Sequence, residues 1–213
     1  MLTLFDYPAS ENAWKVRQLL HHLQRPYRTV KVSIFEGEGR TEEYLRISPT
    51  GTVPAIELDD GRTLAESNAI LFFLATDTPY LPNDAFGRAK VQQWLSFEQE
   101  RVESVIGSLR YWTLTGKLEQ RAPALVAMKR DTGVRTLEIL DRALAQRPFL
   151  TDHGYSIADI SVFAYGGRAE EAGFSLAPYP HVRAWIERVK SQPGFLADMH
   201  AYSDDPHSRR ELP

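Results

Sequence analysis

The first third of the chain alternates short apolar stretches with an amphipathic one, a pattern that predicts a small α/β unit. Residues 2–7 are predicted as a strand, residues 10–23 as a helix, and residues 27–33 as a second strand whose side chains alternate between two faces. Two strands joined through a helix pair in parallel with a right-handed crossover. The opening of the chain therefore predicts a βαβ unit.

A hairpin and a short helix are predicted next. A polar segment, residues 36–48, leads to strands at residues 54–58 and 62–64, with a turn at residues 59–61 between them. Residues 67–75 are an apolar stretch that predicts a short helix. The predicted order is βαβ followed by ββα.

Beyond this point the pattern predicts helices alone. Turn-forming residues mark a linker at residues 79–86, between a first domain at residues 1–78 and an all-helical domain at residues 87–213. Helices are expected at residues 86–115, 122–145, 157–172 and 180–191. The polar residues 199–213 are expected to form a partly mobile tail. The chain as a whole predicts an α/β domain followed by an all-α domain.

The third of these helices begins with a capping motif. In Ser156-Ile157-Ala158-Asp159 the serine hydroxyl can accept a hydrogen bond from the helix backbone, while the Asp159 carboxylate reaches back to the serine amide. Loss of such a cap costs about 0.5–2 kcal/mol. We therefore assign Ser156 and Asp159 to stability rather than to catalysis.

Composition and charge indicate a globular protein that recognises its substrate locally. The chain has 213 residues, 43% of them hydrophobic, and its 25 basic and 28 acidic side chains give a formal charge of −3. This balance provides no electrostatic footprint for nucleic acid or an anionic membrane. The longest wholly apolar run, residues 69–75, is too short to span a bilayer. We expect a cytoplasmic protein with a small-molecule partner.

The absence of cysteine removes whole classes of chemistry. Without Cys the chain has no disulfide framework, thiolate metal site, CxxC redox pair or cysteine nucleophile. The six histidines form no HxxxH or HExxH pattern, and neither a P-loop nor GxGxxG occurs. We expect no metal, and any reactive thiol must arrive with a ligand.

Two short segments have the chemistry to hold a peptide. Val53 precedes Pro54, so its backbone is pushed toward the extended region, and a cis bond would turn its amide and carbonyl toward an added peptide strand. Ser67 is expected as a helix N-cap whose following amides can bind an α-carboxylate, while Glu66 can accept hydrogen bonds from an α-ammonium. Taken singly, each segment fits an ordinary turn or capped helix. Side by side, they predict a site for a γ-glutamyl peptide.

Ser10 is the candidate for activating a ligand thiol. It follows the first predicted strand and opens the first helix, which places its hydroxyl at the positive end of the helix dipole. Serine is too weak an acid to act as the base, but it can donate a hydrogen bond that a thiolate accepts better than a thiol. Lowering a thiol pKa from about 8.5 by ~2 units takes roughly 2.7 kcal/mol, within reach of one charge-assisted hydrogen bond and the dipole. A simple N-cap is the alternative, and both roles are compatible.

The motifs of this chain together resemble those of a known family. They are Pro8-Ala9-Ser10 followed by Lys15-Val16-Arg17, Val53-Pro54-Ala55-Ile56, Glu66-Ser67, and Ser156-Ile157-Ala158-Asp159. Over nearly its whole length the chain resembles a cytosolic glutathione S-transferase of the bacterial serine-type or nu-like kind. The resemblance implies a thioredoxin-like N-terminal domain that binds glutathione, an all-helical C-terminal domain that binds a second substrate, a detoxification role and a homodimer.

The resemblance also implies roles for single residues. In serine-using members the serine stands six residues before the valine of a basic-Val segment, as Ser10 stands to Val16. Asn12 is the rival donor, because a subclass of glutathione-dependent disulfide reductases places Thr and Asn where this chain has Ser10 and Asn12. The order of these residues leaves the choice of thiolate donor open.

One position departs from the family pattern. Many relatives carry Lys or Arg two residues before the proline, where this chain has Thr52, so the glycyl carboxylate of glutathione loses a partner. Arg40 or Lys31 can substitute, although Arg40 lies in a Gly-rich, charged loop typical of solvated side chains.

The second-substrate pocket is expected from position alone. Its candidates are Tyr7, Ser104, Tyr111 and Trp112, with ordinary core packing as the alternative for the aromatic residues. Glu98 falls on the apolar stripe of the first long helix and needs a partner, at a dimer interface or in the ligand cleft, unless it is partly exposed.

The sequence therefore predicts a glutathione transferase that joins the glutathione thiolate to an electrophilic small molecule. A disulfide-bond reductase that works through bound glutathione is the alternative within enzymes. A non-catalytic binding or regulatory module of the same fold is the alternative outside them, since fold alone does not fix function.

Overall fold

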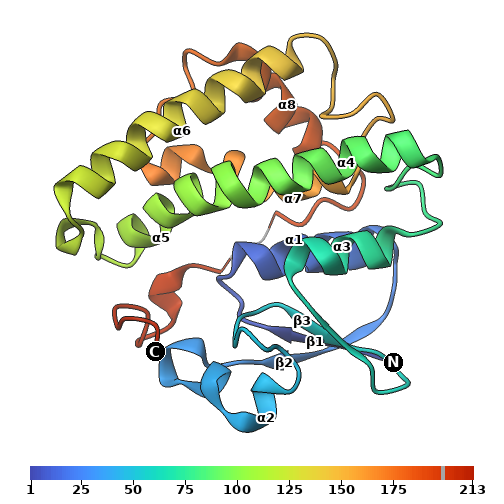
Figure 1. Ribbon diagram of the computed structural model, residues 1–213, viewed down its shortest axis with the longest axis vertical. Helices are drawn as coiled ribbons and strands as arrows, with labels where there is room; N and C mark the ends of the chain where they lie inside the picture. The colour runs from blue at the N-terminus through green and yellow to red at the C-terminus, as the bar shows by residue number, and fades with distance from the viewer. Residues whose placement is uncertain (198–199) are drawn as a thin grey trace. The chain divides into compact units, whose positions relative to one another are not determined.

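The protein consists of two compact units. A computed structural model describes residues 1–197 and 200–213, so residue 199 of the expected tail lies outside the described residues. One unit comprises Met1–Thr76 together with Pro193–Pro213, and the other comprises Asp77–Gln192. Figure 1 follows the chain through both units.

The N-terminal unit is built on a sheet of four strands in the order β2-β1-β3-β4. β1 pairs in parallel with β2 and antiparallel with β3, and β3 pairs antiparallel with β4. The helices α1 and α3 contact each other and lie side by side in Figure 1. The predicted order βαβ followed by ββα is confirmed. The elements are β1 (Leu2–Asp6), α1 (Glu11–His22), β2 (Tyr27–Lys31), α2 (Glu42–Leu45), β3 (Ala55–Glu57), β4 (Thr63–Ala65) and α3 (Ser67–Ala75).

The core of this unit follows from the apolar periodicity of α1. Val16, Leu19 and Leu20, at i, i+3 and i+4, share one face of that helix and are fully buried. The polar segment after β2 contains an element that the hydrophobic pattern did not predict, the short helix α2. It is anchored by the buried Tyr44, whose hydroxyl donates to the Thr52 carbonyl at 2.8 Å. The Thr41 hydroxyl also caps α2 by accepting from the Tyr44 amide at 3.3 Å. Such local contacts give no periodic signal in the sequence.

The second unit is helical throughout its regular elements, as predicted. They are α4 (Ala85–Phe97), a π-helical stretch (Glu98–Gly107), α5 (Ser108–Leu114), α6 (Pro123–Leu144), α7 (Ile157–Gly166) and α8 (Pro180–Lys190). The helix expected at residues 86–115 is continuous from α4 to α5 (Figure 1) but has π-helical pairing in its middle. α7 contacts α4, α8 and the π-helical stretch, and nearly all of its residues are buried. It ends at Gly166, earlier than expected, and a 3-10 turn at Ala169–Ala172 follows.

Glu98 lies at the start of the π-helical stretch and is fully buried, which excludes the partial exposure considered above. The Gln99 amide approaches its carboxylate at 3.5 Å. Breaks in α-helical pairing of this kind are frequent at functional sites.

The capping motif of α7 forms as predicted and is extended by two further donors. The Ser156 amide donates to Asp159 Oδ2 at 3.1 Å, and the Ala158 amide donates to the Ser156 hydroxyl at 3.3 Å. Trp185 Nε1 and the Leu150 amide donate to Asp159 Oδ1 at 2.9 and 3.0 Å. Burial raises the pKa of the Asp159 carboxyl to about 6, although these hydrogen bonds lower it. Asp159 therefore ties α7 to α8 and to the preceding loop.

The end of the chain differs from the expected division into domains. Residues 193–213 group with the N-terminal unit, whereas the pattern placed them with the helices. Trp14 Nε1 donates to the Leu196 carbonyl at 3.1 Å, and the Tyr7 hydroxyl donates to Asp205 Oδ2 at 2.9 Å. The physical reason is a set of specific contacts to residues far away in sequence, which composition does not reveal.

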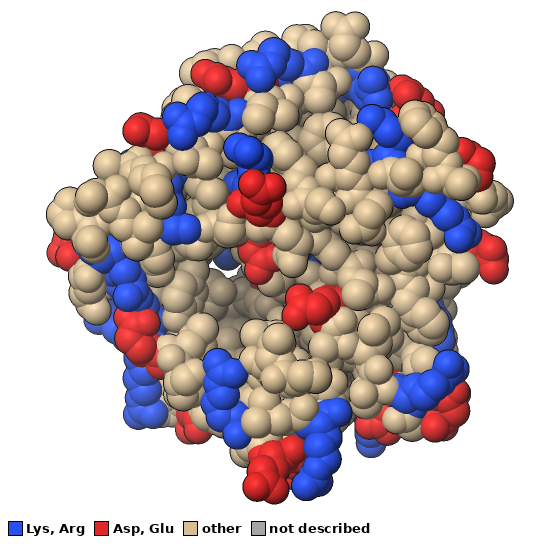
Figure 2. All heavy atoms as spheres, in the orientation of Figure 1, with Lys and Arg blue, Asp and Glu red and all other residues tan. Residues whose placement is uncertain are grey.

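The surface carries charges of both signs. Figure 2 shows basic and acidic side chains interspersed over the face in view, in keeping with the formal charge of −3. Within the described part of the chain, no helix is long and apolar enough to cross a membrane. Nor, in that same part, does any group of three His, Asp or Glu side chains form a candidate metal site.

Candidate functional site

The register of the sheet brings three predicted segments to one end of the N-terminal unit. Phe5 of β1 lies opposite Ala55 of β3, and Ala55 lies opposite Ala65 of β4. β3 runs antiparallel to both neighbours, so the residues before Ala55 lie at the same end as those after Phe5 and Ala65. Residues 53–54, 7–10 and 66–67 therefore converge there.

The segment before β3 has backbone groups that the described part of the chain does not pair. The Val53-Pro54 bond is cis, as the sequence analysis considered. Among the described residues, none hydrogen-bonds to the Val53 amide or carbonyl. The preceding Thr52 carbonyl is fixed by the Tyr44 hydroxyl, whose pKa burial raises above its ordinary value. The Val53 backbone groups are thus available to a ligand backbone.

Ser10 lies in a loop that is held in place by hydrogen bonds from Arg17. Arg17 donates to both Asp6 carboxylate oxygens at 2.5 and 2.7 Å, and to the Pro8 carbonyl at 2.9 Å. The Ser10 hydroxyl accepts from the Ala13 amide at 3.2 Å and so caps α1, as predicted. A hydroxyl that accepts through one lone pair keeps its own proton for donation. The cap and a bond to a ligand thiolate can therefore coexist.

Glu66 holds an unusual backbone conformation, with φ of 70° and ψ of 113°. A positive φ is uncommon for a residue other than glycine, and such residues cluster at functional sites. Glu66 is also the N-cap position of α3, so the expectation that Ser67 is the cap is wrong; Ser67 is the first helical residue. The Glu66 side chain is exposed, and none of the described residues pairs with its carboxylate. That carboxylate is available to a ligand cation.

A buried polar cluster underlies the start of α3. The Ser67 hydroxyl donates to Asn12 Oδ1 at 3.3 Å and accepts from Lys15 Nζ at 3.5 Å. Lys15 is 0% exposed and Ser67 5% exposed. A buried ammonium here adds positive charge to the positive end of the α3 dipole. The sequence did not identify Lys15 as a functional residue. Its position four residues before Leu19, on the apolar face of α1, was the available signal.

The two candidates for the glycyl carboxylate have different surroundings. Arg40 donates to the Thr50 carbonyl at 2.8 Å and to the Pro213 carbonyl at 2.9 Å. Lys31 is exposed and lines a small cavity of about 100 Å³ beside Tyr7. Both stay predictions.

Tyr7 is more deeply buried than a pocket wall requires, at 2% exposed. Its ring packs edge-on against Phe35 with centroids 5.7 Å apart, and its hydroxyl donates to Asp205. Its contacts within the N-terminal unit are therefore those of a structural anchor for the C-terminal segment.

The other predicted pocket residues belong to the helical unit, where they lie among cations. Tyr111 accepts a hydrogen bond from Lys117 Nζ at 2.8 Å. Lys129 Nζ lies 5.5 Å from the Trp112 ring centroid and donates to the Ser104 carbonyl. Desolvation lowers the pKa of Lys129 from its ordinary value. The π-helical stretch, α5 and α6 thus share one aromatic and cationic cluster.

Comparison with known proteins identifies the family. Sequence profiles described as "Glutathione S-transferase, N-terminal domain" and "Glutathione S-transferase, C-terminal domain" match residues 9–77 and 120–188. The disulfide-bond oxidoreductase YfcG of Escherichia coli is 30% identical over 200 residues, which cover 91% of this chain and 92% of that protein. The chain belongs to the glutathione S-transferase superfamily.

Solved structures agree with this membership. A glutathione S-transferase from Pseudomonas fluorescens is 36% identical to this superfamily member, with a TM-score of 0.88 and coverage of 92% of this chain and 97% of the other. A glutathione transferase from Burkholderia graminis, solved with two glutathione molecules bound per subunit, is 27% identical with a TM-score of 0.79, covering 91% and 85%. The predicted fold class, a thioredoxin-like domain plus an all-α domain, is confirmed.

Proposed function

We propose that this glutathione S-transferase superfamily member is a glutathione transferase that binds glutathione at the convergent end of its sheet. The observation that carries the proposal is the register, which brings the Ser10 loop, the Val53 edge and the Glu66–Ser67 corner together. Each of these supplies a different group that a γ-glutamyl thiol needs.

The γ-glutamyl end is matched by two opposite charges. The exposed Glu66 carboxylate accepts hydrogen bonds from the α-ammonium, and its fixed backbone holds it at the mouth of the site. The first amides of α3, which the helix itself does not satisfy, receive the α-carboxylate together with the Ser67 hydroxyl. The buried Lys15 beneath Ser67 strengthens this anion site. The Val53 amide and carbonyl pair with the cysteinyl backbone as an added strand does.

Ser10 acts on the thiol by donating its hydroxyl proton in a hydrogen bond to the sulfur. The thiol proton leaves to solvent, and the thiolate attacks an electrophilic carbon to form a thioether. A leaving group departs with the displaced electron pair, or, in an addition, the substrate carbon gains a proton. Ser10 supplies electrostatic stabilisation and transfers no proton of its own.

Disulfide reduction is the second candidate, and the position of Asn12 favours it. Asn12 is joined to Ser67 at the γ-glutamyl corner, so it too lies beside the proposed glutathione, and the relative YfcG is a disulfide-bond oxidoreductase. In this reaction the glutathione thiolate attacks one sulfur of a disulfide and releases the other as a thiol. A second glutathione then resolves the mixed disulfide to glutathione disulfide, so the absence of cysteine is no obstacle.

Calorimetric titration with glutathione tests the binding site. Glu66→Ala and Ser67→Ala should each weaken binding about tenfold or more, since a charge-assisted hydrogen bond contributes about 1.5–3 kcal/mol. Glu42→Ala and Ser96→Ala, at exposed positions outside the site, are the matched controls and should bind as the parent does. Unchanged affinity in both site variants would overturn the proposed site.

An activity panel then separates the reactions. Glutathione is supplied with aryl halides, epoxides, enones, peroxides and a small dithiol disulfide at matched pH. Conjugation predicts thioether products from the electrophiles. Turnover of the disulfide far above every electrophile would replace conjugation by reduction, and binding without any turnover would leave a non-catalytic module.

A further inference from the structure

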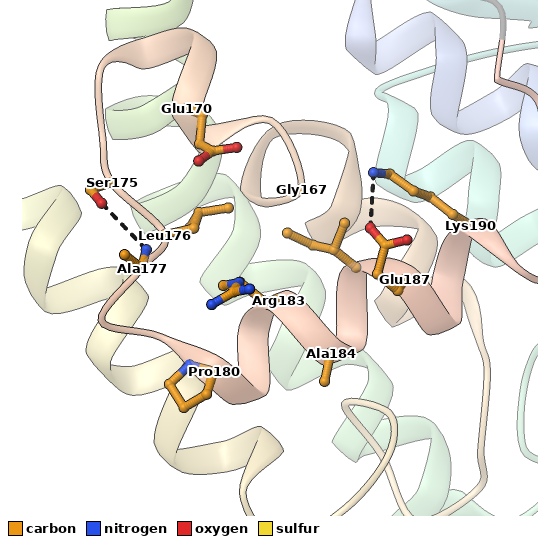
Figure 3. Close-up of a pocket in the computed structure, with 11 residues that line it drawn as sticks. Gly167, Glu170, Ser175, Leu176, Ala177, Pro180, Arg183, Ala184, Glu187 and Lys190 are labelled. Carbon is orange, nitrogen blue, oxygen red and sulfur yellow. Dashed lines mark hydrogen bonds and ion pairs between the residues drawn. The ribbon is translucent and has the colours of Figure 1, made fainter.

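The helical unit contains a second cavity built from residues that the proposed glutathione site does not use. Its volume is about 840 Å³, within the usual range for ligand pockets. Gly167 just after α7, the turn at Ala169–Ala172, the loop after it and α8 line this open cavity (Figure 3). Leu176 and Ile186 line it and are 4% and 5% exposed, so it has an apolar floor.

Two opposite charges on the rim of this cavity are unused by the protein. Arg183 projects from α8 and Glu170 from the turn that faces it (Figure 3). Within residues 1–197 and 200–213, neither side chain has a hydrogen bond or ion pair, and the two do not pair with each other.

The other charged side chains on the same two elements form ion pairs or hydrogen bonds, in contrast to Arg183 and Glu170. Glu171, next to Glu170, accepts from Arg110 Nε at 2.6 Å. On α8, Lys190 pairs with Glu187 at 3.2 Å, and Arg188 donates to the Pro148 carbonyl at 2.9 Å. The two charges left over are the ones that face each other across the apolar floor.

The frame around these charges is fixed before any ligand arrives. Asp141 of α6 caps α8 by accepting from the amides of His181 and Val182 at 2.8 and 3.1 Å. The loop that carries the floor is closed by the Ala177 amide, which donates to the Ser175 hydroxyl at 3.3 Å. A preorganised rim lowers the entropy cost of binding.

We propose that this cavity binds a small zwitterion with an apolar body, an amino acid or short peptide with aliphatic side chains and free termini. The terminal carboxylate pairs with Arg183 and the terminal ammonium with Glu170. The aliphatic side chains cover Leu176 and Ile186.

Methyl-detected NMR titration with the dipeptide Leu-Leu tests this site. Saturable shifts of the Leu176 and Ile186 methyl signals are expected. N-acetyl-Leu-Leu-amide, which has the same apolar body without the charges, should bind about tenfold more weakly. Arg183→Gln and Glu170→Gln should each weaken Leu-Leu binding about two- to fivefold. Arg135→Gln, an exposed arginine on α6, should leave binding unchanged.

Three results would overturn the proposal. The first is the absence of saturable shifts at Leu176 and Ile186. The second is equal affinity of the charged and blocked dipeptides, which would indicate only an apolar groove. The third is a loss confined to Arg183→Gln, which would indicate a carboxylate site rather than a zwitterion site.

Discussion

Glu66 and Lys15 each depart from what their local surroundings favour, and both departures lie at the same corner of the sheet. Glu66 adopts a positive φ that a glycine would adopt more easily. Lys15 holds an ammonium out of water on the core face of α1. Natural sequences break local rules mainly at functional or strained sites. The two residues therefore support a ligand site at this corner independently of the family resemblance.

Replacing Lys15 tests the role of the buried charge. Lys15→Met keeps a side chain of similar length and packing but removes the ammonium 3.5 Å from the Ser67 hydroxyl. We expect glutathione affinity to fall about tenfold, because the anion site loses a positive charge in a poorly solvated position. Calorimetry gives the affinity, circular dichroism confirms the fold, and Lys90→Met on α4 is the control. Parent-like affinity in a folded Lys15→Met protein would show that the charge serves packing alone.

At the scale of elements, the N-termini of the helices have two different roles, ligand binding and stabilisation of the fold. α1 is capped by Ser10 and α3 begins at an exposed, strained Glu66, and both ends point to the proposed glutathione site. α7 begins at a fully buried capping box closed by Ser156 and Asp159. The first two leave groups for a ligand, whereas the third is closed by the protein itself and contributes stability.

Asp159 gives α7 a specific dependence on pH. Its pKa in the folded protein is raised to about 6, so the folded state binds the proton more tightly than the unfolded chain does. The stability it contributes is full below its ordinary pKa and is lost as pH rises through about 6. Between about pH 3 and pH 7, the free energy of unfolding of the parent should fall by about 3 kcal/mol relative to Asp159→Asn, which does not titrate.

Urea unfolding of both proteins across this pH range measures the difference. Glu187→Gln, an exposed carboxylate on α8, controls for a general effect of charge removal. The raised pKa would be contradicted if the difference in free energy of unfolding between the parent and Asp159→Asn did not change with pH. It would also be contradicted if the parent became more stable than Asp159→Asn as pH rises.

At the scale of the whole molecule, the sequence predicted most of the fold because the hydrophobic period identifies helices and strands. It also predicted the segments that the register brings together at the proposed site, because Ser10, Val53-Pro54 and Glu66-Ser67 adjoin predicted elements. It did not predict that Tyr7 contacts Asp205 or that Lys15 is buried, since both depend on contacts made only after the chain folds. The sequence also grouped residues 193–213 with the helical domain. Their polar composition gives no sign that Asp205 accepts a hydrogen bond from Tyr7, 198 residues earlier in the chain.

The Tyr7–Asp205 hydrogen bond should hold the C-terminal segment to the N-terminal unit. Tyr7→Phe keeps the ring against Phe35 and removes the donor, so the free energy of unfolding should fall by about 1.5–3 kcal/mol at neutral pH. Burial raises the pKa of Asp205, but the His207 amide and the Tyr7 hydroxyl lower it further, for a net decrease. The stabilisation is present above the ordinary Asp pKa and is lost as pH falls through the lowered value.

A double-mutant cycle of Tyr7→Phe with Asp205→Asn, measured by urea unfolding, isolates this pair. If the two substitutions change the free energy of unfolding additively, the Tyr7 and Asp205 side chains do not stabilise each other, and Tyr7 is not an anchor. The same Tyr7→Phe substitution should leave the pKa of the bound glutathione thiol at its parent value, which separates Tyr7 from the thiolate donor.

Glutathione bound at the sheet end should have its thiol acidified by Ser10, and the pKa of the bound thiol measures this directly. Thiolate absorbance of bound glutathione, followed against pH, should give a pKa about 2 units below that of the free thiol in the parent protein. In Ser10→Ala the peptide should still bind, and the pKa should rise by about one unit or more, each unit corresponding to about 1.36 kcal/mol. Asn12→Ala is the parallel variant. An unchanged pKa in Ser10→Ala, with a rise in Asn12→Ala instead, would contradict the account and assign the thiolate to Asn12.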